Sequence, residues 1–543
     1  MTSINPQNPH QTLIKSSIFL TITTILFLIT LCPHQSTQQS IITKSSTIQA
    51  TCVYNYTYYG LYTCDLSYNE PVNRTDVLEI TGIHLPNHTD DDVEAVYQYI
   101  RNETYFNGDA MRKFVNLKRI SIIGRDLIDI TPNSFDVCAK LEALAINYGK
   151  YKTLPSGLLK NCVNLRTFEI MSSEIETFPE DFFGSTRNLE EFVVPVNQLT
   201  SLPEKLLQNM EKLRIIRIGY NNLKELSPNF LINCPNLDQF SAYDNQFQTQ
   251  EAITFALNGR INMRYLMLDF NNITNWDFRF FAQFQKLEYL TVGINRGAKL
   301  TNIHWRSLPA SLNELTVYGI GEDIPENSFE RLVNLRALTL YGNDITAFHK
   351  DTFKSLTNLW YLYIYQSELK TLHPDLFQDQ GNLSHLMISG TKIEELPAGL
   401  FVPLVNIGFR NQNNGIHVKH SKLIRINANS FGEHPKLRTI DFAFNEINEI
   451  ERGIFSKFHP NMTYVGLYFN DCVSALLDGV DLDNHERLEQ CYQNWVDIDP
   501  NNRPTTVPPT STTPAGCGSN FKSFEVFVII FVGIFKVLFD YVK

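Results

Sequence analysis

LEEFVVPVN (189–197) is followed 24 residues later by LRIIRIGYN (213–221), and after a further 24 by LDQFSAYDN (237–245). Two earlier segments keep the same interval, LEALAINYG (141–149) and LRTFEIMSS (165–173). A fixed period of this length indicates a chain built from stacked copies of one structural unit.

The repeat continues in both directions from these five segments. Further copies start at Leu117, Met263, Leu287, Leu312, Leu335, Leu359, Leu383, Ile407, Leu437 and Met462, which makes about fifteen repeats. Most are 23 to 26 residues long, but the step from Ile407 to Leu437 takes 30 residues and its first segment, IGFRNQNNG (407–415), matches weakly. We therefore expect an irregular turn at this point.

The apolar residues of each repeat predict its local structure. They stand at offsets 0, 3 and 5, counted from the first leucine, so that they alternate toward one side of a short strand. A single turn cannot bury this apolar side, whereas stacked turns pair their strands into a parallel sheet over a continuous core.

The segments MRYLMLDFNNI (263–273) and LRALTLYGNDI (335–345) match the pattern LxxLxLxxNxL residue by residue. Over roughly residues 75 to 490 the chain resembles the leucine-rich-repeat family, and in particular its secreted or surface-tethered insect members. The resemblance implies an α/β solenoid, a right-handed horseshoe with a parallel concave sheet and disulfide-stapled caps.

Three further slots of the repeat carry residues that we interpret as structural. At offset 8 an amide can satisfy buried backbone groups of adjacent turns; the asparagines there are Asn197, Asn221, Asn245, Asn271, Asn295, Asn343, Asn445 and Asn470. Six residues before the first leucine, a periodic aromatic predicts a buried spine, made of Phe135, Phe183, Phe281, Phe329, Phe353, Phe377, Phe401 and Phe431. Cys138, Cys162 and Cys234 share another slot and are interpreted as buried core thiols, although adjacent turns could bring Cys138 and Cys162 within disulfide distance.

Both ends of the array need a cover for their apolar surface. The pairs Cys52/Cys64 and Cys472/Cys491 flank the repeats and are the predicted disulfides of two caps. The segment DDDVEAVYQYIRNE (90–103) predicts a helix with an acidic first turn, and we favour this role for its aspartates over a calcium site.

The N-terminal region predicts entry into the secretory pathway. Lys15 precedes an apolar run from Ile18 to Cys32, which has the length of a signal-peptide core, with an uncleaved signal anchor as the alternative. Glycosylation sequons occur at Asn55, Asn73, Asn87, Asn102, Asn272, Asn382 and Asn461.

The C-terminal region predicts a tether. DPNNRPTTVPPTSTTP (499–514) has the composition of an extended stalk, and an apolar tail follows it. Small residues from Ala515 to Ser519 suggest a glycolipid-anchor signal, a single membrane span is the equal alternative, and free secretion is the third. The predicted organisation is a signal peptide and leader (1–50), an N-terminal cap (51–116), repeats (117–470), a C-terminal cap (471–498), a stalk (499–520) and an anchor segment (521–543).

Composition and motifs argue against several classes of function. The net charge of −11 gives no reason to expect a nucleic-acid partner. No nucleophile with a base, paired carboxylates or glycine-rich phosphate loop stands out, so we expect neither an enzyme nor a cofactor. His417 and His420 are the nearest approach to a metal-ligand pair, but they lack a third ligand and we expect no metal.

Side chains at offsets 2, 4 and 6 should point out of the concave sheet, where a ligand could meet them. These slots are rich in tyrosine, which suits recognition surfaces and exposed strands alike: Tyr243, Tyr265, Tyr289, Tyr318, Tyr341, Tyr361, Tyr363, Tyr365, Tyr464 and Tyr468. Five of them, Tyr318, Tyr341, Tyr361, Tyr363 and Tyr365, come from three consecutive repeats and form the predicted ligand-binding patch.

Three functions remain open at this point. The first is a cell-surface or extracellular protein that binds a protein ligand or a counterpart on another cell through its concave face. The second is a secreted innate-immunity factor that recognises microbial surface molecules. The third, a hydrolase on a solenoid scaffold, has no motif in its favour.

Overall fold

A computed structural model of the 543-residue chain describes residues 47–57, 60–68, 77–100, 104–106, 108–293, 299–342, 344–408, 414–479 and 482–496. The predicted signal segment (18–32), the stalk (499–520) and the anchor segment (521–543) lie outside the described residues. Within the described ranges, no helix has the length and apolar character needed to cross a membrane.

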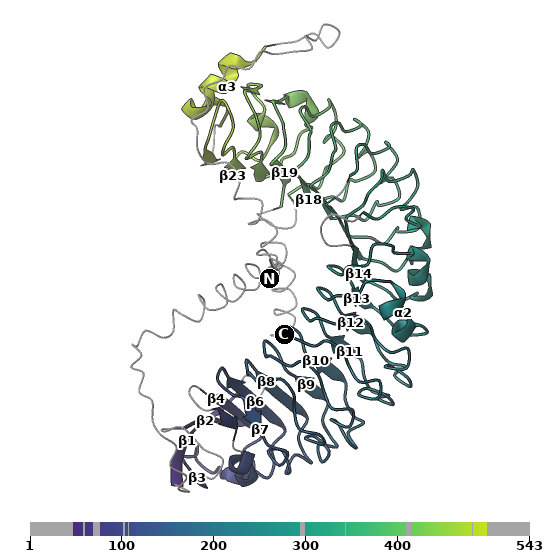
Figure 1. Ribbon diagram of the computed structural model, residues 1–543. Coiled ribbons are helices and arrows are strands. Elements are labelled where there is room, and N and C mark those ends of the chain that lie inside the picture. Colours follow the sequence, from purple (N-terminus) through teal and green to yellow (C-terminus); the bar gives the residue numbers. More distant parts are fainter. Residues whose placement is uncertain are drawn as a thin grey trace, which may run out of the picture.

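The described part of the chain forms an arc with its strands along the inner side (Figure 1). They make one 20-stranded sheet in which the successive turns, from β4 to β23, pair in parallel. Its strands are β1 (Thr47–Tyr56), β2 (Tyr62–Tyr68), β3 (Val77–Thr81), β4 (Ala95–Ile100), β6 (Arg119–Gly124), β8 (Ala143–Asn147), β9 (Thr167–Glu169), β10 (Glu191–Val193), β11 (Ile215–Arg217), β12 (Gln239–Ser241), β13 (Tyr265–Met267), β14 (Tyr289–Gly293), β15 (Glu314–Tyr318), β16 (Ala337–Tyr341), β17 (Tyr361–Tyr365), β18 (His385–Ser389), β19 (Ile416–Lys419), β21 (Thr439–Asp441), β23 (Met462–Gly466) and β24 (Leu476–Gly479).

The outer side of the arc holds less α-helix than the α/β expectation implies. Two α-helices are described there and at the C-terminal end, α2 (Glu251–Leu257) and α3 (Glu489–Asn494). The rest is turns, the strand pairs β5 (Tyr105–Phe106) with β7 (Asp129–Ile130) and β20 (Arg425–Ile426) with β22 (Glu449–Ile450), and the 3-10 segments Asp90–Asp92, Gly108–Lys113, Phe278–Gln283, Trp305–Ser307, Ala428–Ser430, Phe455–Lys457, Leu482–Asn484 and Glu486–Leu488. A 24-residue turn leaves little chain for a return helix, and α2 lies in the longer, 26-residue repeat that starts at Leu237.

The core follows the repeat. In the turn that starts at Leu189, the side chains at offsets 0, 3 and 5, Leu189, Phe192 and Val194, are fully buried. The predicted phenylalanine spine is buried as well, with rings of neighbouring turns stacked 6.2 to 6.4 Å apart from Phe329 through Phe353 and Phe377 to Phe401. Phe353 and Phe377 therefore each pack on a copy in the turn before and on one in the turn after.

The offset-8 asparagines bind backbone groups of adjacent turns. Asn221 donates its Nδ2–H groups to the carbonyls of Val194 (3.0 Å) and Ile218 (3.1 Å), and its Oδ1 accepts the N–H of Leu199 (3.0 Å). Comparable bonds are made by Asn197, Asn245, Asn445 and Asn470, and the donor half of the pattern by Asn271. Asn295 and Asn343 lie outside the described residues.

A second asparagine ladder runs along the position just before the first leucine. Asn188 donates from Nδ2 to the carbonyl of Val163 in the preceding turn at 2.8 Å, and Asn358 does the same to Val333 at 2.9 Å. The other members are Asn116, Asn164, Asn236, Asn262, Asn334, Asn382 and Asn406. The recurring Asn-Leu pair could have revealed this ladder in the sequence.

The helix predicted over residues 90–103 is wrong. A short 3-10 turn, Asp90–Asp92, is followed by β4, which pairs with β2 and β6. Val96, Gln98 and Ile100 are buried in alternation, because this segment continues the 24-residue frame one turn before Leu117. The period of two in AVYQYI therefore prevails over the helical interpretation.

The irregular turn is an insertion rather than a weak strand. Gly408 still bonds through its N–H to the carbonyl of Ser384, as expected one residue after the first apolar slot. The strand then resumes only at β19, where Ile416 stands opposite Leu386 and Val418 opposite Ile388. The extra residues thus enter between offsets 1 and 2, so the strand is IHVK and not the expected segment that begins at Ile407.

Three disulfides staple the solenoid. Cys52–Cys64 joins β1 to β2 in the N-terminal cap, and Cys472–Cys491 ties the loop before β24 to α3 in the C-terminal cap. Cys138 and Cys162 also form a disulfide, so their interpretation as free thiols is wrong. Stacking brings the Cα atoms of this shared slot to 4.8 Å, within bonding reach; Cys234, three turns after Cys162, is a free and buried thiol.

Candidate functional site

The concave side chains come from offsets 2, 4 and 6, which alternate with the buried slots of each strand. In β17 the buried Leu362 and Ile364 alternate with Tyr361, Tyr363 and Tyr365, which project from the inner face of the arc. Parallel pairing in register then places the same offset of each turn side by side. A side chain that recurs at one offset therefore forms a row across the sheet.

The five tyrosines of the predicted patch form two rows that meet at Tyr365. Across β15, β16 and β17, Tyr318 stands opposite Tyr341 and Tyr341 opposite Tyr365, with ring centroids 5.4 and 5.5 Å apart. Along β17 the rings of Tyr361, Tyr363 and Tyr365 stack at 6.4 and 6.0 Å with nearly parallel planes. We call these five residues the tyrosine patch.

Burial divides the patch into support and contact residues. Tyr318 and Tyr365 are 9% and 8% exposed, and the hydroxyl of Tyr365 lies 3.0 Å from the sulfur of Met387. Tyr341, Tyr361 and Tyr363 are half-buried. Burial, helped by Tyr361 and Glu314, raises the pKa of Tyr363 to about 12. The phenol of Tyr363 therefore stays neutral at physiological pH and can both donate and accept.

The remaining tyrosines fall into two groups. Tyr265 and Tyr289 lie beside each other on β13 and β14, with ring centroids 6.2 Å apart, and Tyr243 contributes from the turn before. Tyr464 and Tyr468 belong to the last turn, and β18, β19 and β21 separate them from the patch. The structure thus brings the first group close to the patch and leaves the second apart.

A buried carboxylate lies beneath the first group. Asp269 is 4% exposed and accepts a hydrogen bond from the hydroxyl of Thr291. Burial, with a contribution from Asp244, raises its pKa to about 6. Asp269 in turn adds to the effect of burial in raising the pKa of Tyr289 and Tyr318.

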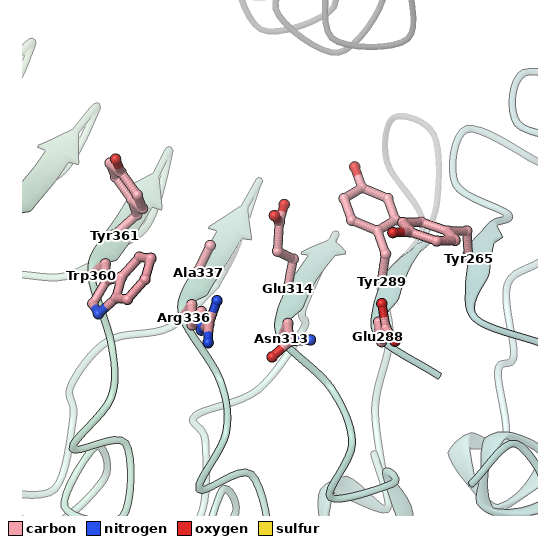
Figure 2. A pocket seen from close by; sticks show the side chains of 9 residues that line it. All are labelled: Tyr265, Glu288, Tyr289, Asn313, Glu314, Arg336, Ala337, Trp360 and Tyr361. Carbon is pink, nitrogen blue, oxygen red and sulfur yellow. The ribbon is translucent and has the colours of Figure 1, made fainter. Parts of the chain in front are cut away.

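A depression of about 400 Å³ opens at the start of strands β13 to β17 (Figure 2). Its lining comprises Tyr265, Glu288, Tyr289, Asn313, Glu314, Arg336, Ala337, Trp360 and Tyr361. The tyrosine pattern in the sequence pointed to three of these residues. The other six were missed, because residues at offsets 1 and 2 identify a hollow only when the sizes of side chains on neighbouring strands are compared: Glu288, Asn313, Glu314, Arg336, Ala337 and Trp360.

The edge beside this depression carries a ladder of alternating charges at offset 1. It begins with Glu94 and Lys118 and ends with Arg264 and Glu288. Arg264 holds Glu288 by two hydrogen bonds, of 3.0 and 2.8 Å. Between these ends the pairs Arg166–Glu190 and Arg214–Asp238 repeat the arrangement. The ladder keeps opposite charges in adjacent turns, which is a structural role.

His417 and His420 do not form a metal-ligand pair. His417 lies on the concave face with Nδ1 3.8 Å from a carboxylate oxygen of Asp441, and Lys419 Nζ lies 3.6 Å from the same oxygen. His420, at the next bend, stacks on Phe444 at 4.2 Å. His417 instead lies beside His385 of the neighbouring strand β18, with ring centroids 4.7 Å apart.

One group of three possible metal ligands occurs in the described ranges, Glu326, His349 and Asp351. Nδ1 of His349 already accepts the backbone N–H of Asp351 at 3.2 Å, and Lys350 binds the Asp351 carboxylate at 2.7 Å. The group is therefore accounted for as a capped, ion-paired turn.

The described sequons lie on exposed positions. Asn55 and Asn87 belong to the N-terminal cap, Asn272 follows β13, and Asn382 and Asn461 precede β18 and β23. Asn73 and Asn102 lie outside the described residues. None of the described five occupies a concave slot.

Two family descriptions match parts of the chain. The BspA type leucine rich repeat region matches residues 100–214 and 309–414 in six copies, and a leucine rich repeat matches residues 187–247. No curated protein matches the sequence.

Among solved structures, the fold is similar to that of a Leptospira interrogans LRR protein, with 19% identity, a TM-score of 0.53, and coverage of 71% of this chain and 87% of that one. A Drosophila Toll–Spatzle complex gives 15% identity and a TM-score of 0.49, covering 80% of this chain and 65% of that one. An internalin from Listeria monocytogenes gives 17% identity and a TM-score of 0.46, covering 61% of this chain and 88% of that one. The repeats matched by the family descriptions, the parallel sheet and the asparagine ladder together show that the described part of the chain has the leucine-rich-repeat solenoid fold.

Proposed function

We propose that this protein is an extracellular or cell-surface recognition protein that binds a protein ligand through the tyrosine patch on its concave face. The observation that carries the proposal is the alignment of tyrosines in two rows that meet at Tyr365. Tyrosine combines large contact area with a hydroxyl group at low entropic cost, and stacked neighbours hold these rings in place before a ligand arrives.

Three disulfides and the exposed sequons support an extracellular setting. The apolar run at residues 18–32 fits a signal peptide, and residues 499–543 fit a stalk with a membrane anchor. Treatment of intact expressing cells with a glycosidase and with a phosphatidylinositol-specific phospholipase tests this part. A mass shift after glycosidase treatment would support glycosylation of the sequons. Release by the phospholipase would support a glycolipid anchor, whereas surface protein that resists release indicates a membrane span.

The absence of a catalytic constellation at the patch favours binding over catalysis. The phenol of Tyr363 is neutral, because its pKa is raised to about 12, and the Asp441 carboxylate on β21 is paired with His417 and Lys419. The innate-immunity alternative would instead be favoured by two results together. The protein would be found free in the medium, and it would bind microbial surface molecules rather than proteins.

The direct test is a screen of the full chain against an array of extracellular protein domains. Each ligand found is then measured against the variant Tyr361→Ala/Tyr363→Ala, which removes two half-buried contact rings. Tyr99→Ala is the matched control, because Tyr99 is an exposed concave tyrosine of the distant strand β4. We expect the double variant to weaken binding at least tenfold while the control does not. Ligands that bind both variants like the wild type would refute the patch as the binding site.

A further inference from the structure

The depression described above lies where the charge ladder of offset 1 ends. Arg264 holds Glu288 through two hydrogen bonds, of 3.0 and 2.8 Å. The next turn places the neutral Asn313 at this offset, and the turn after it places Arg336, whose guanidinium lies 4.7 Å from the ring centre of Trp360. Within the described part of the chain, the Asn313 amide and the Arg336 guanidinium form no hydrogen bond or ion pair. These two side chains can therefore bind a ligand with their polar groups.

The charged groups around the depression balance one another. Two carboxylates, those of Glu288 and Glu314, stand against the guanidinium groups of Arg264 and Arg336. Arg264 neutralises Glu288 directly, and Glu314 already takes part in an interaction within the protein. A charged ligand would lose its water here without meeting an excess of opposite charge, so the lining favours an uncharged ligand.

Aromatic rings border the depression at both ends of its row of offset-2 side chains. Tyr265 and Tyr289 stand at one end and Tyr361 at the other, and the small side chain of Ala337 leaves a gap between Glu314 and Tyr361 (Figure 2). Three strand spacings, about 14 Å, separate β14 from β17. The volume of about 400 Å³ lies within the range of small-molecule sites, which is about 300 to about 1,000 Å³.

We propose that the depression binds a sugar ring of an uncharged glycan carried by the protein ligand. The inference rests on the proposed function and adds the chemistry of one anchoring group, since Tyr361 belongs to both the tyrosine patch and the depression. A pyranose ring has C–H groups on its faces, which pack on aromatic rings, and hydroxyl groups around its edge, which both donate and accept. Above Ala337 such a ring can lie against Tyr361 while its hydroxyls bond to Asn313 and Arg336.

The arrangement fits a sugar better than a peptide side chain. An apolar side chain in the depression would cover the polar groups of Asn313 and Arg336 without giving them partners, which is costly. A charged side chain would meet lining groups whose charges already balance. A ring that carries several hydroxyl groups avoids both costs.

An array of oligosaccharides tests the full chain directly, with uncharged glycans of mannose and N-acetylglucosamine beside acidic glycans that contain sialic acid. We expect uncharged glycans to be retained. Ala337→Leu fills the gap from a half-buried strand position, and Asn313→Ala removes the amide; each should raise the Kd of the tightest array glycan about tenfold. Ala143→Leu is the matched control and should leave the Kd unchanged, because Ala143 is half-buried at the same offset of the distant strand β8. An unchanged urea midpoint verifies the folding of each variant.

A glycosylated protein ligand provides the second test. Enzymatic removal of its glycans should weaken its binding to the wild type about as much as Ala337→Leu does. The two changes together should weaken binding little more than either alone, because both remove the same contact.

The outcomes separate this inference from the function on which it rests. A ligand that binds equally well without its glycans, yet loses binding to Tyr361→Ala/Tyr363→Ala, would overturn the glycan site and keep the concave protein-binding site. An array that retains no glycan, or glycan binding that ignores both Ala337→Leu and Asn313→Ala, would overturn the glycan site as well. Retention of acidic glycans alone would overturn the uncharged ligand. Protein ligands that bind every concave variant like the wild type would overturn the proposed function itself.

Discussion

Cys138 and Cys162 occupy the same slot of two successive turns and are joined by a disulfide, with 4.8 Å between their Cα atoms. The bond links residues that are 24 apart in sequence, so it closes a loop of one repeat. Its slot places it within the array rather than in a cap, and both cysteines are less than 5% exposed.

Removal of this bond should destabilise the N-terminal third of the solenoid. Loop-closure entropy for one repeat amounts to about 3 kcal/mol, so Cys138→Ser/Cys162→Ser should lower the urea midpoint clearly. Cys234→Ala, which removes a buried thiol without a cross-link, is the control and should cost much less. Full alkylation of both Cys138 and Cys162 in the unreduced, unfolded protein would show that the disulfide does not form.

Asn221 provides a test of the offset-8 ladder. Asn221→Leu leaves the N–H of Leu199 without its buried acceptor and removes one of the two amide donors of the Val194 and Ile218 carbonyls, which predicts a loss of about 2 kcal/mol in unfolding free energy. The neighbouring, half-buried Asn222 is the matched control, and Asn222→Leu should change stability by well under half as much. Equal effects of the two substitutions would argue that the amide contributes no more than its bulk.

Asp269 should destabilise the folded protein at neutral pH. Its pKa rises from 3.8 to about 6, mainly through burial, so the folded state binds the proton more tightly than the unfolded state. The ionised Asp269 therefore lowers the unfolding free energy fully above about pH 6, and this loss disappears as the pH falls toward 3.8. Asp269→Asn should therefore raise stability at neutral pH by up to about 3 kcal/mol, with a gain that shrinks on acidification. Denaturant titrations across this pH range measure it, and a gain independent of pH would contradict the assignment.

His385 should have the opposite pH dependence. Burial, with His417 and Lys419, lowers its pKa from 6.5 to about 3, so that only the unfolded chain takes up the proton between these values. Stability should fall by about 2 kcal/mol between about pH 6.5 and pH 5 from this group alone. His385→Asn keeps an acceptor near the position of Nδ1, which binds the N–H of Gly415, and should flatten this loss. A variant with the same acid sensitivity as the wild type would exclude His385 as its source.

Much of the fold could be predicted because its information is local and repeated. Leu189, Phe192 and Val194 show the inward alternation in one turn, and the 24-residue interval copies it along the chain. The same frame located Asn221 in the ladder and Tyr341 and Tyr365 on the concave face. Residues 90–103 were misread, because a single charged cluster at their start outweighed the period of two in β4.

The candidate site was predictable only in part. Tyrosines could be assigned to the concave face from their offsets, but the sequence pattern does not show where that face is hollowed. That Ala337 forms a gap between Glu314 and Tyr361 depends on register between three strands, and that Tyr318 and Tyr365 are buried supports depends on their neighbours.

The sequence by itself thus determined the solenoid, its period and the side on which each strand residue lies, because these follow from alternation and from a repeat that every turn restates. Only the tertiary structure decided the Cys138–Cys162 bond, the point at which the long turn departs from the frame, and the hollow above Ala337. Each of these depends on how closely two turns approach and how their side chains differ in size, which no periodic pattern specifies.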